Sequence, residues 1–436
     1  MCTLFRCREK FERDDNRCLN ECDKRAYRDL NPGLGLRKPW CYPGYTIGPC
    51  FLLGIFIWVD FVFLFFMYKV ISEGLTQIYV PVLGAFGSRA GGLDRRPPVF
   101  FNSVMCLNRG LTVLFMRAVG GGVFGDVLAG SGAKGLRVAV EAGCSVFLND
   151  ANSDAVDLIS RNVELNGVSE CVSVFNLDGN RFMFEHSGEM DFIDIDPFGS
   201  PGPFIDAALL ASKKKGFIGV TATDTAALSG VYPGTCVRRY LARPLRGYLC
   251  HEVGLRILAG YVVRMAAKYD LGVSPVLSHF TRHYMRLYLM LGRGVSLAKE
   301  SLGNMGFIYF CNSCKSFSFE QAEVPSKSVC GCGCRLRHAG PLWLGSLNDK
   351  SILSKMQSFS ERDDEKKLLS LLQCELDEPF FYDVHRVSSD LSVSSPKIDV
   401  VLERLRNQGF TASRTHFNPV GVKTDASLDV VKKTLI

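Results

Sequence analysis

The chain has 436 residues, 47% of them hydrophobic, and a formal net charge of +7 at pH 7. This apolar content is enough for substantial buried cores, which excludes a disordered chain, and the length predicts roughly two to three domains. The charge is compatible with a polyanionic partner but does not identify one, because many enzymes carry as much. The sequence shows no internal repeat, coiled coil or long low-complexity tract.

The N-terminal region contains an apolar run whose length is marginal for a membrane. Cys50 to Met67 carries a single charge, Asp60, so this run is a transmembrane candidate by length. It lies too far from the start to be a secretory signal, and acidic residues such as Glu9 and Asp14 argue against a mitochondrial presequence. We therefore expect membrane association only if residues 50–67 are a genuine anchor.

The pattern of strand, glycine turn and helix comes next along the chain. Val123 to Leu128 is a strand-like run, and Leu136 to Ala142 is compatible with a helix. Between them, Gly130-x-Gly132-x-x-Gly135 permits a tight turn and a close approach of the backbone to a ligand. The same spacing fits the dinucleotide fingerprint, so a nicotinamide oxidoreductase is an alternative.

Carboxylates stand at the ends of three successive predicted strands. Asp126 precedes the glycine turn by four residues, Asp150 follows the strand from Ser145 to Leu148, and Asp178 follows the strand from Val172 to Phe175. A carboxylate in the position of Asp150 can bind ribose hydroxyls, and one in the position of Asp178 suits an adenine amino group. With Asp126, as in methyltransferase first motifs, they favour S-adenosylmethionine as the cofactor.

The run from Asp194 to Pro201 has a specific chemical use. Phe192 to Ile195 is predicted to be a short buried strand, which puts Asp196, Pro197 and Phe198 at the active-site end of a parallel sheet. An amine conjugated to a base is a poor nucleophile, and it is helped by a carboxylate and a backbone carbonyl that accept its N–H bonds. An adjacent aromatic ring can stack on the base. The pattern resembles the acceptor side of methyltransferases that act on exocyclic amines.

From about Val70 to Thr424 the chain resembles the tRNA (guanine-26) dimethyltransferase family, which converts guanosine at that position to its dimethylated 2-amino form. The matching stretches are VISEG (70–74), FFNSVMCLNRGL (100–111), GLRVAVE (135–141), DIDPFGSP (194–201), VTATDTAALSG (220–230), CHEVGLRIL (250–258), AGPLWLG (339–345) and SRTHF (413–417). Because these stretches begin just after Met67, we prefer Met67 as the initiator, with residues 1–66 a gene-model extension, over a membrane anchor.

The resemblance implies roles for individual residues. Residues that would bind S-adenosylmethionine are Arg109, Arg137, Asp150, Asp178 and Gly179. Asp196 and Phe198 would serve the target base, which must leave its stack in the folded tRNA. The chain departs from the family after the Asn-Arg pair, where an acidic residue is common and this sequence has Gly110.

Five of the 17 cysteines form a cluster between residues 311 and 334. Cys311-x-x-Cys314 is a knuckle after the strand-like run 307–310, and Cys330-x-Cys332-x-Cys334 follows a loop. Four thiolates fit a tetrahedral structural zinc, and a disulfide framework is the alternative, which a reducing compartment disfavours. In the family the second pair is spaced CxxC. Alignment from the AGP stretch makes Cys330 and Cys332 the ligands, with Cys334 as a substitute.

The C-terminal region carries many basic residues. Most are ordinary surface charges, but Arg414 and His416 lie in the SRTHF stretch and, with Lys423, are predicted to contact RNA phosphate or ribose. The amphipathic run from Ile398 to Leu405 predicts a helix that packs on a sheet with its charges in solvent.

The sequence thus predicts an α/β protein in three parts: an extension over residues 1–66, a Rossmann-like class I methyltransferase domain over 67–272, and a smaller α+β tRNA-binding domain with the zinc site over 273–436. We expect an intracellular enzyme of the nucleus or cytoplasm, not a secreted one, with no obligate protein partner. A catalytically silent RNA-binding module is the non-enzyme alternative, and the intact Asp196-Pro197-Phe198 argues against it.

Overall fold

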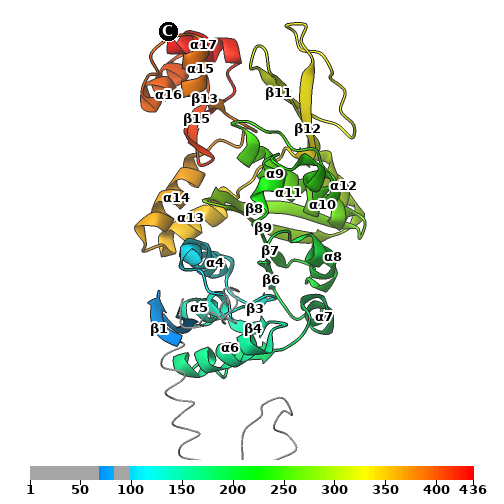
Figure 1. The fold of residues 1–436 in the computed structure, drawn as a ribbon, viewed down its shortest axis with the longest axis vertical. Coiled ribbons are helices and arrows are strands. Elements are labelled where there is room, and N and C mark those ends of the chain that lie inside the picture. Colours follow the sequence, from blue (N-terminus) through cyan, green and yellow to red (C-terminus); the bar gives the residue numbers. More distant parts are fainter. Residues whose placement is uncertain (1–67, 83–98) are drawn as a thin grey trace, which may run out of the picture. The chain divides into compact units, whose positions relative to one another are not determined.

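A computed structural model of the chain describes residues 68–82 and 99–436, and Figure 1 shows their arrangement. These residues belong to one compact unit. The predicted extension 1–66, the apolar run 50–67 and the proposed initiator Met67 lie outside the described residues. Within residues 68–82 and 99–436, every helix is too short or too polar to cross a membrane.

A seven-stranded sheet forms the centre of the fold, in the order β5-β4-β3-β6-β7-β9-β8. The strands are β3 (Val123–Asp126), β4 (Ser145–Asn149), β5 (Val172–Phe175), β6 (Phe192–Ile195), β7 (Phe217–Ala222), β8 (Leu271–Thr281) and β9 (Tyr284–Arg293). The pairs among β3 to β7 are parallel, which confirms the predicted Rossmann-like arrangement. The carboxyl ends of these five strands therefore meet at one edge of the sheet.

Helices cover both faces of this sheet, as a parallel sheet requires. One face carries α4 (Cys106–Val119), α5 (Ala133–Ala142), α6 (Ser153–Asn166), α13 (Lys350–Phe359) and α14 (Asp363–Cys374), and the other carries α7 (Gly179–Glu185), α8 (Gly202–Ala211) and α11 (Cys250–Ala267). Each face has its own cluster of buried apolar side chains. Shorter helices connect the strands: η1 (Ser103–Met105), α9 (Thr225–Leu228), α10 (Pro233–Tyr240) and α12 (Val295–Gly303).

The central sheet extends past the predicted domain boundary at residue 272. β9 pairs antiparallel with β7, from Phe217 opposite Met290 to Ala222 opposite Met285, and β8 pairs with β9. Without this hairpin, β7 would be an edge strand with unpaired backbone groups. The sequence predicts the strand at 284–289 as the opening of the second domain, and the structure pairs this strand with β7 of the central sheet. The strand pattern alone does not tell which sheet a strand joins.

Two small antiparallel sheets follow. The first has the order β11-β10-β12, and the second β13-β15-β14. Their strands are β10 (Met305–Cys311), β11 (Phe317–Gln321), β12 (Leu336–Trp343), β13 (Tyr382–Asp383), β14 (Ala412–Thr415) and β15 (Asn418–Thr424). The second sheet is covered by α15 (Val384–Asp390), α16 (Ile398–Asn407) and α17 (Leu428–Leu435). α16 confirms the predicted amphipathic helix, with Val401 and Leu405 buried.

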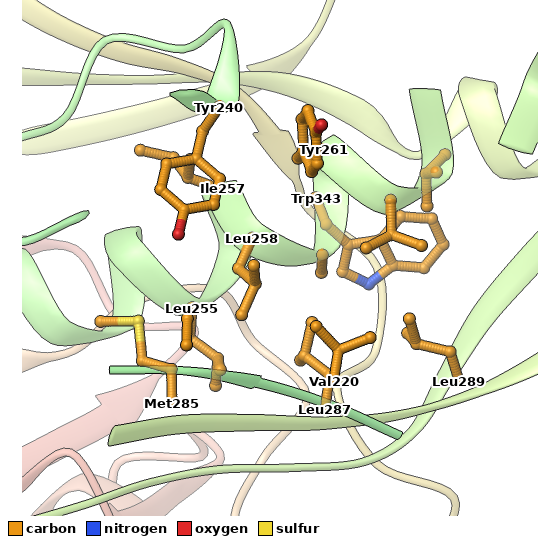
Figure 2. Packing of buried hydrophobic residues seen from close by; sticks show 14 of the residues in the cluster. Val220, Tyr240, Leu255, Ile257, Leu258, Tyr261, Met285, Leu287, Leu289 and Trp343 are labelled. Atoms are coloured by element: carbon orange, nitrogen blue, oxygen red, sulfur yellow. The ribbon is translucent and has the colours of Figure 1, made fainter. Parts of the chain in front are cut away.

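Helix α11 joins the first small sheet to the central one. Figure 2 shows its side chains Leu255 and Leu258 on the side of the helix toward β9, where Met285 and Leu287 lie, and all of these belong to one buried cluster with Trp343 of β12. All five are at most 4% exposed, so the core is continuous from the central sheet into β12.

A hairpin of β1 (Tyr68–Glu73) and β2 (Thr76–Pro81) completes the described fold. Its turn needs Gly74, whose φ is +63°. Ile78 and Val80 are buried against Ala133 at the start of α5. The hairpin thereby brings Glu73 to the edge of the sheet where the site lies.

Candidate active site

The glycine turn after β3 has the geometry that its sequence predicts. Gly130 and Gly132 have φ angles of +57° and +76°, which favour glycine, and Gly132 is the residue before α5. A Cβ on Gly135 would lie 2.3 Å from Leu148 Cδ2 of β4, so the third glycine lets α5 pack closely on the sheet. The first N–H groups of α5 have no side-chain cap, which leaves donors at the turn.

The predicted cofactor carboxylates lie at the carboxyl edge of the sheet. Asp150 is half-buried, and its Oδ2 accepts a hydrogen bond of 2.8 Å from the Gly130 backbone N–H. Asp178 is exposed and caps α7 by accepting from Asn180 N at 3.0 Å. A Cβ on Gly179, the first residue of α7, would lie 3.0 Å from Val127 Cγ1, so only a small residue fits there.

Arg109 and Arg137, also predicted to bind the cofactor, are both buried and paired with carboxylates. Arg109 donates to both oxygens of Glu73, with its Nε 2.6 Å from Oε1. Arg137 binds Glu141 through two hydrogen bonds of 2.7 Å and reaches Glu73 at 3.2 Å. Glu73 and Glu141 are not among the predicted site residues, although both lie inside matched stretches.

Gly110 leaves room for a carboxylate from another element. A Cβ on Gly110 would lie only 2.0 Å from Oε1 of Glu365, a buried residue of α14, and 3.7 Å from Arg137 Nη1. Burial raises the pKa of Glu365, while the charges of Arg362 and Arg137 oppose that rise. An acidic group thus stands beside this position, but α14 supplies it instead of α4.

Asp196 lies at the centre of a charge network. Its Oδ2 is 2.5 Å from Nζ of Lys134, which also contacts Asp194 Oδ2 at 2.5 Å. Burial raises the pKa of Asp196, but the charges of Lys134 and Arg286 outweigh burial and hold that pKa below its ordinary value. Asp196 is therefore a carboxylate at neutral pH. Its side chain is 20% exposed, while that of Lys134 is 7% exposed, so only the carboxylate faces solvent appreciably.

Arg286 closes the network from β9. It pairs with Asp194 on β6 and donates a hydrogen bond of 2.9 Å to Thr221 Oγ1 on β7. A Cβ on Gly219 of β7 would lie 2.4 Å from Asp194 Oδ1, so this glycine lets the pair meet across the strand. The hairpin β8–β9 consequently helps to hold the active-site residues in place, because Arg286 lies on β9.

Two buried acceptors beside the network have no hydrogen-bond partner among the described residues. They are Asp126 Oδ2 and Asn108 Oδ1, and both residues are at most 2% exposed. Burial raises the pKa of Asp126 to about 7 against the opposing charge of Lys134. Unpartnered acceptors at this depth are costly unless a donor binds them, so they suit a ligand that carries N–H groups.

An exposed aromatic pair lies next to the carboxylate. Phe198 is 77% exposed and Phe100 53% exposed, and their ring centroids are 4.6 Å apart in an edge-on arrangement. The loop is held by Gly199, whose φ is +88° and whose N–H donates to Thr223 Oγ1 at 2.7 Å. The structure thus brings Asp196, Pro197 and Phe198 together with Phe100, which the sequence analysis missed.

Comparison with known proteins decides the family. Residues 82–436 match the family described as N2,N2-dimethylguanosine tRNA methyltransferase. The chain belongs to this family. A tRNA (guanine(26)-N(2))-dimethyltransferase of Pyrococcus horikoshii is 40% identical over 386 residues, 84% of this chain and 97% of that protein. One from Methanospirillum hungatei is 41% identical over 369 residues, 83% of this chain and 97% of that protein.

A solved structure agrees with this membership. Trm1 from Pyrococcus horikoshii, in complex with S-adenosyl-L-methionine, has a TM-score of 0.77 and 38% identity to the chain, and covers 84% of this chain and 99% of its own. Membership in a family of tRNA methyltransferases removes the reason for the nicotinamide alternative, whose only support is the glycine spacing.

In this tRNA methyltransferase, four cysteine thiols gather in the first small sheet. Cys311 ends β10, Cys314 follows in the turn, and Cys330 and Cys332 precede β12. The Sγ atoms of Cys311 and Cys332 are 3.5 Å apart, as are those of Cys314 and Cys330, and all four lie within 4.8 Å of one another. Zinc bonded to four thiolates at about 2.3 Å holds its ligands at similar separations. Cys334 is not in this group, so the structure favours Cys332.

Two of the three predicted RNA contacts are buried. Lys423 is 2% exposed and lies between Glu252 Oε1 at 3.1 Å and Glu375 Oε1 at 3.2 Å. The His416 side chain is 1% exposed and contacts Glu375 at 2.6 Å. Neither side chain has surface to offer a phosphate, because Lys423 packs against Glu252 of α11 and Glu375 after α14, and His416 packs against Glu375. Arg414 is exposed and pairs with Asp399.

Proposed function

We propose that the protein transfers methyl groups from S-adenosylmethionine to the exocyclic 2-amino group of guanosine 26 in tRNA, first one and then a second. The observation that carries this proposal is the position of ionised Asp196 at the carboxyl end of β6, beside an exposed aromatic pair and the glycine turn. The relatives named above, which span nearly their whole length in the match, support this choice of substrate.

The residues present fit the cofactor. The unpartnered acceptors Asp126 Oδ2 and Asn108 Oδ1 suit its ammonium group, and Asp150 and Asp178 suit its ribose and adenine. Gly179 lets the start of α7 pack closely on Val127, and Glu73 holds both Arg109 and Arg137. When bound, the cofactor supplies a methyl group made electrophilic by its sulfonium.

Asp196 acts on the nucleophile. Its carboxylate would accept an N–H bond from the guanine amine, so that the nitrogen lone pair is less committed to the ring as the N–C bond forms and the S–C bond breaks; the proton that the amine loses would pass to this carboxylate. The Pro197 carbonyl is the second acceptor, and Phe198 stacks on the flipped base, with Phe100 edge-on against the Phe198 ring. Lys134 is a positioning residue, because it fixes the acceptor oxygen and keeps the carboxylate ionised.

The direct test is to incubate the protein with S-adenosylmethionine and unmodified tRNA and to analyse the nucleosides by mass spectrometry. We expect methylated and dimethylated guanosine, lost when guanosine 26 is replaced by adenosine. Methylation that persists in the replaced tRNA would contradict the assigned position. Since tRNA is the substrate, we also place the activity inside the cell.

We further propose that Cys311, Cys314, Cys330 and Cys332 hold a structural zinc that fixes the loop before β12. Metal analysis of the purified protein should give one zinc per chain, and Cys314→Ser or Cys332→Ser should lose most of it. Cys334→Ser is the matched control and should keep its zinc. The opposite result, with metal lost from Cys334→Ser and retained in Cys332→Ser, would overturn the ligand set.

A further inference from the structure

Four arginines follow the last parallel strand of the central sheet, and the site described above uses none of them. Arg238, Arg239, Arg243 and Arg246 lie between Thr225 and Cys250, a stretch that contains no aspartate, glutamate or lysine. All four residues are exposed. This dense positive charge arises on α10 and the loop after it, beside the sheet edge that carries Asp196.

Three of these guanidinium groups are not neutralised. Arg239 donates to Asp224 Oδ2 at 2.8 Å. Among residues 68–82 and 99–436, no carboxylate lies within ion-pair distance of Arg238, Arg243 or Arg246. We call these three residues the arginine patch. Arginine presents a planar fork of donors that matches phosphate oxygens, so an unpaired arginine patch is suited to a polyanion.

Helix α10 is fixed to the catalytic loop. Tyr240 at its end is fully buried and points into the core, as Figure 2 shows. Its hydroxyl donates to Asp224 Oδ1 at 2.5 Å, just after β7, and also bonds Ser200 in the loop after Asp196. A Cβ on Gly202, at the start of α8, would lie 3.9 Å from the Arg239 carbonyl oxygen. The end of α10, next to the arginine patch, therefore contacts the loop after Asp196, in which the target base is proposed to bind.

The other side of the arginine patch is fixed to the sheet that carries the cysteines. The backbone of Arg243 exchanges two hydrogen bonds of 2.9 Å with Gly340 of β12. Arg264 of α11 donates to the Tyr240 carbonyl at 2.8 Å and so holds the end of α10. The backbone under the arginine patch is thus set before any ligand arrives, which lowers the entropy lost on binding.

We infer that Arg238, Arg243 and Arg246 bind backbone phosphates of the tRNA strand that flanks the target guanosine, and hold that strand beside the catalytic loop while the base is flipped. The inference rests on the proposed function. An enzyme that extrudes a base must grip the backbone next to it, because unstacking costs free energy that contacts to the flanking strand offset. Of the three residues predicted to contact RNA, Lys423 and His416 are buried and only Arg414 is exposed, so the arginine patch adds exposed cations that can take part in that grip.

The test compares two variants that lose the same charge. Arg238→Ala with Arg246→Ala removes two cations of the arginine patch and spares Arg243, whose backbone joins β12. The control is Lys214→Ala with Lys215→Ala, two exposed lysines that precede β7 at the opposite, amino edge of the sheet. tRNA affinity is measured at several salt concentrations, together with S-adenosylmethionine binding and the KM and kcat for tRNA methylation.

We expect the arginine variant to reduce the magnitude of the slope of log affinity against log salt by about 1.4 to 1.8, at about 0.7 to 0.9 for each of the two lost phosphate contacts. Between 1 M and 0.1 M salt this slope change corresponds to a loss of tRNA affinity of about 25- to 60-fold at the lower concentration, seen as a higher KM with kcat within a few fold. Cofactor binding should not change, and the lysine control should keep the wild-type slope.

An unchanged salt slope in the arginine variant, or an equal change in the lysine control, would contradict the role of the arginine patch. If the wild-type protein methylates tRNA in the same experiment, the proposed function is unaffected by that result. Absence of methyl transfer by the wild-type protein is the separate failure of that function. If the double variant does not fold, Arg246→Gln carries the same test, with an expected fall of about 0.7 to 0.9 in the slope.

Discussion

Replacement of Asp196 by alanine should lower the rate of methyl transfer by about 100- to 1,000-fold, since removal of one preorganised group at the reacting centre typically costs that much. The carboxylate is held by Lys134 at 2.5 Å and is the exposed member of its network, so its loss removes the acceptor for the amine. S-adenosylmethionine affinity should stay within a few fold, measured by calorimetry beside single-turnover methylation.

Asp150→Ala is the matched control, because it removes a carboxylate from the neighbouring strand end. It should weaken S-adenosylmethionine binding by about 10- to 100-fold, the range expected when charge-assisted ribose hydrogen bonds are lost. tRNA affinity should be similar in both variants. Near-wild-type turnover in Asp196→Ala, or unchanged cofactor affinity in Asp150→Ala, would reassign the respective carboxylate.

Lys423→Met should destabilise the fold by about 3 to 5 kcal/mol, the usual cost of removing one partner from a buried charge pair. Lys423 of β15 neutralises Glu252 of α11 and Glu375 after α14, and all three are at most 5% exposed. The charges of His416 and Lys423 hold the pKa of Glu375 well below its ordinary value despite burial. Arg256 also pairs with Glu252, and His416 with Glu375, but both carboxylates would lose the cation between them in a dry interior.

The measurement is the free energy of unfolding from denaturant titration, with Arg414→Ala as the control. Arg414 pairs with Asp399 at 2.8 Å, but both side chains are well exposed, so its loss should change stability by less than about 0.5 kcal/mol. If Lys423→Met unfolds at the wild-type midpoint, the cluster is not a stabilising contact between α11 and the C-terminal sheet.

The apolar runs in the sequence predicted most of the strands in the catalytic half of the fold. β5 and β6 have the bounds expected from their apolar runs, and Asp126, Asp150 and Asp178 stand at strand ends as predicted. These features are local, since a glycine turn or a strand end is written in a few consecutive residues.

The partners of those residues could not be found in the same way. Lys134 lies inside the glycine turn, but its contacts Asp194 and Asp196 are 60 and 62 residues away, and Arg286 is 92 residues from Asp194. A basic residue in the middle of the apolar strand 284–289 was the one available signal, because such a residue is rarely buried without a partner. Lys423 gave the same signal in the strand 418–424.

Gly110 and Glu365 constrain each other through shared space. Because Glu365 Oε1 occupies the volume within 2.0 Å of where a Cβ on Gly110 would be, a side chain at residue 110 and the carboxylate at residue 365 cannot coexist in this geometry. A side chain introduced at residue 110 would therefore displace the Glu365 carboxylate, which is the flexible end of its side chain. Arg137 would survive that displacement, since Glu73 and Glu141 still bind it. In an alignment of homologues, the two positions should covary, with acid at one accompanied by a small residue at the other.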